Sequence, residues 1–129
     1  MKLLIVGYGK MGRMVEELAG DAFEIVGRVD QGRDEGADAD VAIDFSTADA
    51  LVSNFAQYVG RRMPVVIGTT GWHAQADRLR EEAAKGGIGV VSSANFSIGV
   101  NIFQLVVAEA ARLMTAQPQF GSWIHEIHH

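Results

Sequence analysis

Short apolar runs rich in valine and isoleucine recur along the chain and are separated by longer stretches of a different pattern. Each run is continuously apolar rather than alternating, which is typical of strands buried on both faces of a parallel sheet. The runs predict strands at Leu3–Val6, Glu24–Val29, Val41–Phe45, Pro64–Ile67 and Ile88–Val91. The apolar pattern is lost between Thr115 and Gly121, and a last strand is predicted at Ser122–Ile127.

Between most of these runs, apolar residues return at intervals of three and four, which is the spacing of one helix face. The three faces are Met11, Met14, Val15 and Leu18; Leu51, Phe55 and Val59; and Ile102, Leu105, Val106 and Leu113. Strand alternating with helix predicts a parallel sheet with right-handed crossovers. The link from Asp30 to Asp40 is polar, contains Gly32 and Gly36, and is too short for a covering helix, so we expect an irregular loop. The predicted fold class is α/β, a Rossmann-like doubly wound parallel sheet with helices on both faces.

Length, composition and charge limit the classes of partner and chemistry that fit the sequence. A chain of 129 residues that is 48% apolar suits one domain, which we take as residues 1–129. The formal net charge of −5 disfavours nucleic acid and anionic membranes as partners, because binding a polyanion needs a basic surface. The absence of cysteine excludes disulfides and thiolate chemistry, and no grouping of His, Asp and Glu has metal spacing, so no metal is expected. The apolar start of the chain is interrupted at Gly7 before it reaches signal or spanning length, which predicts a cytoplasmic location.

A G-x-G-x-x-G motif follows the first predicted strand directly and opens the first predicted helix. Its residues are Gly7, Tyr8, Gly9, Lys10, Met11 and Gly12. In this context the first glycine permits a tight turn, the second lets the backbone approach a pyrophosphate, and the third lets helix and strand pack closely. The motif therefore predicts a dinucleotide site, although a tight turn without a ligand would give the same glycines.

An aspartate closes the second predicted strand. Asp30 lies 23 positions after Gly7, close to the distance expected for an acid that binds the adenosine ribose. Its carboxylate would accept hydrogen bonds from the ribose hydroxyls and repel a 2′-phosphate, which favours NADH over NADPH. Arg28 and Arg33 are near in sequence, and either could receive a 2′-phosphate, so strict NADH selectivity does not follow. A solvated aspartate at the start of a loop is the alternative interpretation.

Three further segments lie at the carboxyl ends of predicted strands, where ligands bind in open α/β sheets. They are Val41–Ser46, Gly68–Gly71 and Ser93–Asn101, and each includes residues with hydroxyl, carboxylate or amide groups. Any one of them could be only a turn between strand and helix, as Ser97 before the helix from Ile98 would be. Their combination, with Glu126-Ile127-His128-His129 at the end, resembles the dihydrodipicolinate reductase family over essentially the whole chain.

The resemblance implies NAD(P)H-dependent reduction of a cyclic, imine-like dicarboxylate in lysine and diaminopimelate biosynthesis. It implies that the nicotinamide half of the cofactor is contacted by Gly68, Thr69, Thr70, Ser93, Ala94, Asn95 and Phe96. It makes His128 the proton-transfer residue, and His129 and Thr70 substrate contacts. A histidine suits proton transfer because its pKa lies near neutrality. Phe96 has a plain core interpretation as well.

The family pattern continues past the histidines with a lysine and an Asp-Ala-Pro-Ser-Gly-Thr segment, whereas this sequence ends at His129. We therefore expect these residues to carry mainly the cofactor-binding half of the reductase, with the substrate domain absent or truncated. Two alternatives stay open: a non-catalytic dinucleotide-binding or sensing module, and the cofactor domain of another dehydrogenase, such as homoserine or aspartate dehydrogenase. A homo-oligomer is compatible with the sequence.

Overall fold

The computed structural model describes residues 1–30, 38–125 and 127. These residues form two compact units, Met1–Ala94 and Asn95–His129, and each is described by itself. Residues 31–37, which make up most of the predicted irregular loop, lie outside the described part. The assignment of all 129 residues to one dinucleotide-binding domain stays a prediction.

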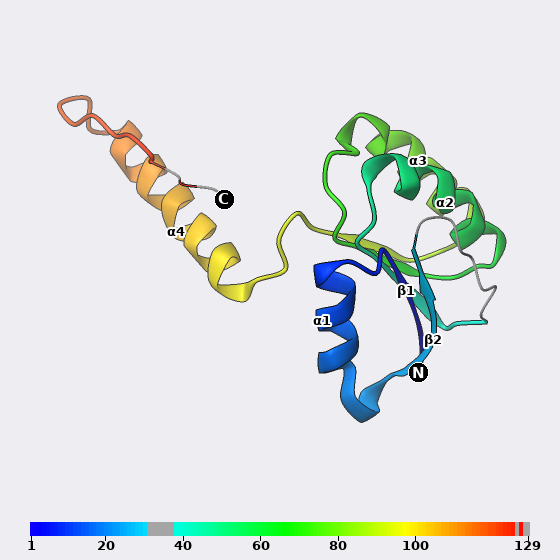
Figure 1. Ribbon diagram of the computed structural model, residues 1–129. Helices are drawn as coiled ribbons and strands as arrows, with labels where there is room; N and C mark the ends of the chain where they lie inside the picture. The colour runs from blue at the N-terminus through cyan, green and yellow to red at the C-terminus, as the bar shows by residue number, and fades with distance from the viewer. Residues whose placement is uncertain (31–37, 126, 128–129) are drawn as a thin grey trace. The chain divides into compact units, whose positions relative to one another are not determined.

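The first unit contains a parallel sheet with helices between its strands (Figure 1). In chain order its elements are β1 (Lys2–Val6), α1 (Lys10–Ala19), β2 (Glu24–Val29), β3 (Val41–Asp44), α2 (Ala48–Gly60), β4 (Val65–Ile67), α3 (Ala76–Gly86) and β5 (Val90–Ser92), with short 3₁₀ turns η1 (Gly20–Ala22) and η2 (His73–Gln75). Within the described residues the sheet has five strands in the order β2-β1-β3-β4-β5, and every neighbouring pair is parallel. The chain moves outward from β1 in both directions, so right-handed crossovers place α1 on one face and α2 and α3 on the other. The predicted α/β fold class is confirmed.

The strand limits differ from the prediction at several ends. β1 begins one residue earlier than predicted, and β3 ends at Asp44 rather than Phe45. β4 excludes Pro64, which has no N–H to donate to a ladder. β5 lies at Val90–Ser92 rather than Ile88–Val91, because pairing with β4 sets its register: Val65 is opposite Val90 and Ile67 opposite Ser92.

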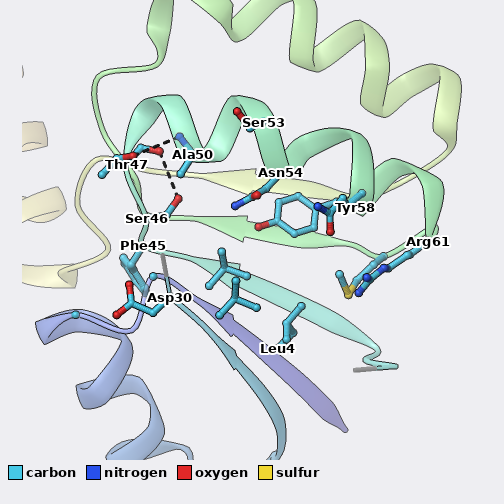
Figure 2. Close-up of a pocket in the computed structure, with 16 residues that line it drawn as sticks. Leu4, Asp30, Phe45, Ser46, Thr47, Ala50, Ser53, Asn54, Tyr58 and Arg61 are labelled. Atoms are coloured by element: carbon cyan, nitrogen blue, oxygen red, sulfur yellow. Dashed lines mark hydrogen bonds between the residues drawn. The ribbon is translucent and has the colours of Figure 1, made fainter. Parts of the chain in front are cut away.

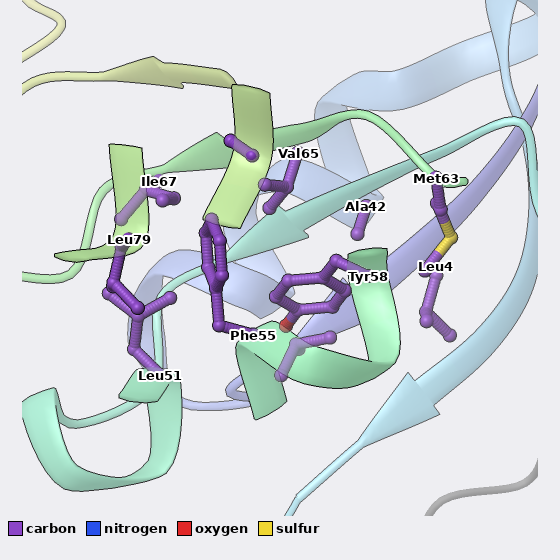
Figure 3. Packing of buried hydrophobic residues seen from close by; sticks show 11 residues of the cluster. Leu4, Ala42, Leu51, Phe55, Tyr58, Met63, Val65, Ile67 and Leu79 are labelled. Carbon is purple, nitrogen blue, oxygen red and sulfur yellow. The ribbon is translucent and has the colours of Figure 1, made fainter. Parts of the chain in front are cut away.

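The main core lies between the sheet and the two helices α2 and α3 (Figure 3). Its buried members include Leu4, Ala42, Leu51, Phe55, Tyr58, Met63, Val65, Ile67, Leu79 and Ala83. Phe55 and Leu51 are almost completely removed from solvent, as predicted for the second helix face, and Val59 is packed at its margin. Complete burial of side chains of this size stabilises the fold by about 1.5–3 kcal/mol each, which is enough to fix α2 on the sheet.

The face that carries α1 is less completely covered. Gly12 is the buried residue of α1, whereas the predicted apolar face keeps Met11 and Leu18 exposed in this unit, at 45% and 77%. These side chains border an apolar groove of about 430 Å³ over Leu3 and Ile43 of the sheet. The predicted helix is therefore present, and among the described residues most of its apolar face is exposed.

The second unit contains α4 (Ile98–Thr115), as the third predicted helix face requires. Ile102 and Leu105 of that face are exposed among the described residues, at 56% and 71%. By length and composition alone, α4 is long and apolar enough to cross a membrane, a test that core helices of soluble proteins also pass. The predicted strand Ser122–Ile127 is wrong for its described residues, which have no regular structure. A strand needs a neighbour to pair with, and the described residues of this unit contain no other strand.

Candidate dinucleotide-binding site

In the loop from β1 to α1, two glycines have no room for a side chain, because neighbouring backbone atoms lie where a Cβ would be. Gly7 has φ +84°, and a Cβ there would lie 2.4 Å from the carbonyl carbon of Phe45. A Cβ on Gly12 would lie 2.5 Å from the carbonyl oxygen of Gly7. Gly7 therefore permits the turn and Gly12 the close packing of α1 on the loop, which are the roles that the motif predicts for its first and third glycines.

Gly9 is different, because a Cβ on this residue would meet no atom within 4 Å. It is the N-cap of α1, and it has neither a side-chain cap nor an acidic residue in the first turn beside it. The amino-terminal N–H groups of a helix need acceptors, and the helix dipole favours an anion at this end. The open side of Gly9 thus offers a phosphate both space and hydrogen-bond donors.

Open space continues from this glycine into a cavity of about 530 Å³ on the α2 side of the sheet (Figure 2). Gly7 and Gly9 line it at the end of β1, Asp30 at the end of β2, and Ser46 at the end of β3. Its volume is within the range of small-ligand sites. The predicted ribose acid and the predicted phosphate loop therefore line the same cavity.

The end of β3 is organised by one buried carboxylate that sequence reasoning did not single out. Asp44 has no exposed surface, and its Oδ1 accepts hydrogen bonds from the Ser46 hydroxyl at 2.6 Å and the Thr69 hydroxyl at 2.9 Å. The Ser46 N–H also donates to Oδ1, at 2.9 Å, and the Tyr58 hydroxyl donates to Oδ2 at 2.7 Å. Asp44 thereby ties together the loops after β3 and β4 and the carboxyl-terminal part of α2. An aspartate near the end of an apolar run, with a serine two positions later, is the signal that could have indicated it.

The loop after β4 is held against this carboxylate. The N–H groups of Gly68 and Thr69 donate to the Asp44 carbonyl, and the indole of Trp72 donates to the Thr69 carbonyl at 2.8 Å. A Cβ on Gly68 would lie 2.0 Å from the ring of Phe45, so a larger residue there would have to displace that ring. The Thr69 hydroxyl is turned to Asp44, whereas Thr70 is exposed.

The predicted nicotinamide loop is divided between the two units. In the first unit, the Ser93 N–H donates to the Ile67 carbonyl at 3.1 Å, which extends the pairing of β5 with β4. In the second unit, Asn95 Oδ1 accepts from the Ser97 N–H at 2.8 Å, and Asn101 Nδ2 donates to the Asn95 and Ser97 carbonyls. Ser97 is the N-cap of α4, and its hydroxyl accepts from the Val100 N–H at 3.4 Å, which agrees with the alternative interpretation of this residue as the start of the helix.

Phe96, the remaining member of that loop, is 45% exposed and is not buried within its own unit. The structure brings the glycine loop, Asp30, Gly68–Thr70 and the pair Ser93–Ala94 to the carboxyl ends of the strands of one sheet. Arg33, Glu126, His128 and His129 lie outside the described residues.

A parallel sheet whose first strand leads through a glycine loop into a helix, with a carboxylate after the second strand, defines a Rossmann-like dinucleotide-binding fold. The sequence model of the family described as "Dihydrodipicolinate reductase, N-terminus" matches residues 30–96, which is about half of the chain. The chain therefore belongs to the dihydrodipicolinate reductase family and matches its amino-terminal part, as the sequence motifs predict.

Curated relatives named 4-hydroxy-tetrahydrodipicolinate reductase agree with this assignment. The protein of Christiangramia forsetii is 34% identical over 134 aligned residues, which cover 100% of this chain and 56% of that protein. That of Caldanaerobacter subterraneus is 35% identical over 144 residues, with the same two coverages. The Archaeoglobus fulgidus protein is 41% identical over 93 residues, or 71% of this chain and 34% of that protein. The chain thus spans about half the length of the relatives that it matches throughout.

Proposed function

We propose that the chain binds NAD(P)H and is the cofactor-binding part of a reductase that acts on 4-hydroxy-tetrahydrodipicolinate. The observation that carries the binding proposal is Gly9, whose open side adjoins a cavity also lined by Asp30. In this proposal the Gly7–Gly12 loop receives the pyrophosphate at the start of α1, and Asp30 accepts hydrogen bonds from the adenosine ribose. The reductase activity is supported by the names of the relatives.

The nicotinamide half is assigned by family resemblance to the loops after β4 and β5. Within the first unit, Asp44 and Trp72 fix the loop after β4, so the exposed Thr70 is presented from a rigid support. Gly68, Thr69, Ser93, Ala94, Asn95 and Phe96 complete the proposed set of cofactor contacts. When bound, the nicotinamide supplies the hydride, and the protein contributes binding and orientation.

The substrate side of the site is proposed on resemblance alone. His128 transfers a proton to the reduced substrate, and His129 and Thr70 contact it. The substrate is a small dicarboxylate. A cytoplasmic location and a partner set without nucleic acid or membrane stay predictions from composition and charge.

The direct test is a titration of the 129-residue polypeptide with NADH and with NADPH, followed by cofactor fluorescence. We expect saturable binding with one cofactor per chain, and competition by ADP-ribose, because the glycine loop and Asp30 are proposed to hold the adenosine diphosphate half. If neither dinucleotide bound saturably to the folded polypeptide, the proposed function would be wrong.

A further inference from the structure

Three side chains from three different elements meet beside the glycine loop. The carboxylate of Glu16, on α1, forms an ion pair with the guanidinium of Arg28, on β2, and Arg28 Nε donates to Glu16 Oε2 at 2.9 Å. The hydroxyl of Tyr8, within the glycine loop, donates to the same carboxylate oxygen. The Arg28 guanidinium carbon also lies 5.9 Å from the centre of the Tyr8 ring. Glu16 therefore engages two nitrogens of Arg28 at once, the geometry in which a guanidinium binds a carboxylate most strongly.

The position of Arg28 gives this cluster a functional meaning. Arg28 precedes Asp30 by two residues in the sequence, so the Cα atoms of the two residues are at most about 7 Å apart. That separation is within the reach of an arginine side chain. In dinucleotide-binding folds an arginine near the ribose acid is the group that accommodates a 2′-phosphate, by the same bidentate geometry that it uses for a carboxylate.

We propose that Glu16 is a positioning residue for cofactor choice: it holds Arg28 against α1 and Tyr8, so that the guanidinium does not serve a 2′-phosphate and NADH is preferred over NADPH. The inference rests on the proposed function and extends it from the cofactor class to the choice between two cofactors. Asp30 disfavours the 2′-phosphate by direct repulsion, whereas Glu16 acts through Arg28. A carboxylate and a phosphate compete for one guanidinium, and Glu16 is the competitor built into the fold.

The cluster is accessible to such competition. The side chains of Arg28 and Glu16 are 43% and 26% exposed, so a phosphate can approach the guanidinium from solvent. An exposed ion pair contributes little to stability and is weakened by salt. A cofactor phosphate must displace the Glu16 carboxylate to bind this guanidinium, so the side chain at position 16 decides how readily it binds.

A purely structural role, in which the pair only joins α1 to β2, predicts different effects. Removing either partner would then lower stability and leave the ratio of the two dissociation constants unchanged. The positioning role predicts that loss of the Glu16 carboxylate improves NADPH binding, and that this gain requires Arg28. The two roles therefore predict different ratios of the dissociation constants for NADPH and NADH.

The test measures dissociation constants for NADH and NADPH at low ionic strength, with the 129-residue polypeptide. Glu16→Gln should tighten NADPH binding roughly fivefold, the scale of one exposed ion pair, and change NADH binding less than about twofold. Glu17→Gln, at the exposed neighbouring position, is the matched control and should change neither constant. Glu16→Asp keeps the charge and should retain most of the wild-type ratio, whereas Glu16→Gln combined with Arg28→Ala should lose the NADPH gain.

Equal changes for both cofactors in Glu16→Gln, or a gain for NADPH that persists without Arg28, would overturn the inference while leaving the proposed function intact. If Glu16→Gln does not fold, the single variant Arg28→Ala tests the inference. It should leave NADPH affinity within about twofold of wild type, since Glu16 already engages the guanidinium. A large loss would show that Arg28 serves the phosphate in spite of Glu16, which contradicts the inference. Failure of the wild-type chain to bind either dinucleotide would overturn the proposed function, and this inference with it.

Discussion

The hydroxyl of Tyr58, near the carboxyl end of α2, donates a 2.7 Å hydrogen bond to the buried carboxylate of Asp44 at the end of β3. The other carboxylate oxygen accepts hydrogen bonds from the hydroxyls of Ser46 and Thr69. A buried polar group needs hydrogen bonds in place of its hydration. This one has such partners from three parts of the chain, all of which border the proposed cofactor site. The site is therefore supported by a polar group inside the fold as well as by its glycine loop.

Asp44→Asn should destabilise the first unit by about 2–4 kcal/mol, because the amide presents a donor where the structure supplies donors already. Tyr58→Phe removes one partner and should cost about 1–2 kcal/mol. Urea unfolding followed by circular dichroism measures both changes. Asp21→Asn, an exposed aspartate in η1, is the control and should stay within about 0.5 kcal/mol of wild type. If Asp44→Asn left the stability unchanged, the carboxylate would not be the group that organises these loops.

Gly9→Val should weaken NADH binding at least about tenfold, or about 1.4 kcal/mol, because the branched side chain fills the open space proposed for the pyrophosphate. The fold should be kept, since a Cβ at Gly9 meets nothing within 4 Å. Valine is a poorer N-cap than glycine, so stability should fall by only about 1 kcal/mol. NADH titration and thermal unfolding measure the two quantities.

Two other glycines provide the controls for Gly9→Val. Gly60→Ala, where a Cβ also meets nothing within 4 Å, should leave binding unchanged. Gly7→Ala should unfold the loop, since it combines φ +84° with the clash against Phe45. Unchanged NADH affinity in a folded Gly9→Val protein would remove the glycine loop from the binding site.

How far the sequence predicts this site depends on how local each feature is. The glycine loop and Asp30 were predictable because each is defined by its own strand end and a short spacing. The role of Asp44 was not, because its partners Tyr58 and Thr69 are 14 and 25 positions away and meet it only in the folded sheet. The strand predicted at Ser122–Ile127 failed for the same kind of reason. An apolar pattern shows that a segment can be a strand, and a neighbour decides whether it is one.

Asp30→Ala should weaken NADH binding roughly fivefold, since the hydrogen bonds to the ribose hydroxyls are lost. NADPH should lose less or gain, because the repulsion of its 2′-phosphate disappears at the same time. The ratio of the two dissociation constants should therefore move toward parity or reverse. Asp21→Ala is the control. A ratio that does not move would identify Asp30 as a solvated loop residue.

The ion pair between Glu16 and Arg28, beside the glycine loop, should make the stability of the fold depend on pH in the acid range. Hydrogen bonds from the Arg28 guanidinium, and then from the Tyr8 hydroxyl, lower the pKa of Glu16 from its usual 4.5 to about 2. Arg13 lies near the Tyr8 ring as well. A carboxyl whose pKa is lower in the folded state stabilises the fold above its unfolded pKa and loses that contribution as pH falls through the folded value. The difference in melting temperature between wild type and Glu16→Gln should thus be constant above about pH 5, shrink below pH 4.5 and vanish near pH 2.

The Glu17→Gln variant should follow wild type throughout this acid range. If the difference between wild type and Glu16→Gln were the same at pH 3 as at pH 7, the charge of Glu16 would have no part in the pair.

The polypeptide of these 129 residues should bind NADH yet oxidise it slowly when offered 4-hydroxy-tetrahydrodipicolinate. Relatives that match throughout have 44% of their length without a counterpart here, the complement of the 56% that is covered. Turnover needs the substrate to be held within about 3–3.5 Å of the nicotinamide, and such orientation accounts for about 7–11 kcal/mol of a barrier. In the proposed function, only Thr70 and His129 contact the substrate, and the proposed proton donor His128 does not position its acceptor. Absorbance of the reduced cofactor measures the rate, with a full-length relative as reference. A rate within about tenfold of that reference would contradict the prediction, whereas substrate-dependent oxidation at any measurable rate would exclude a purely non-catalytic binding module.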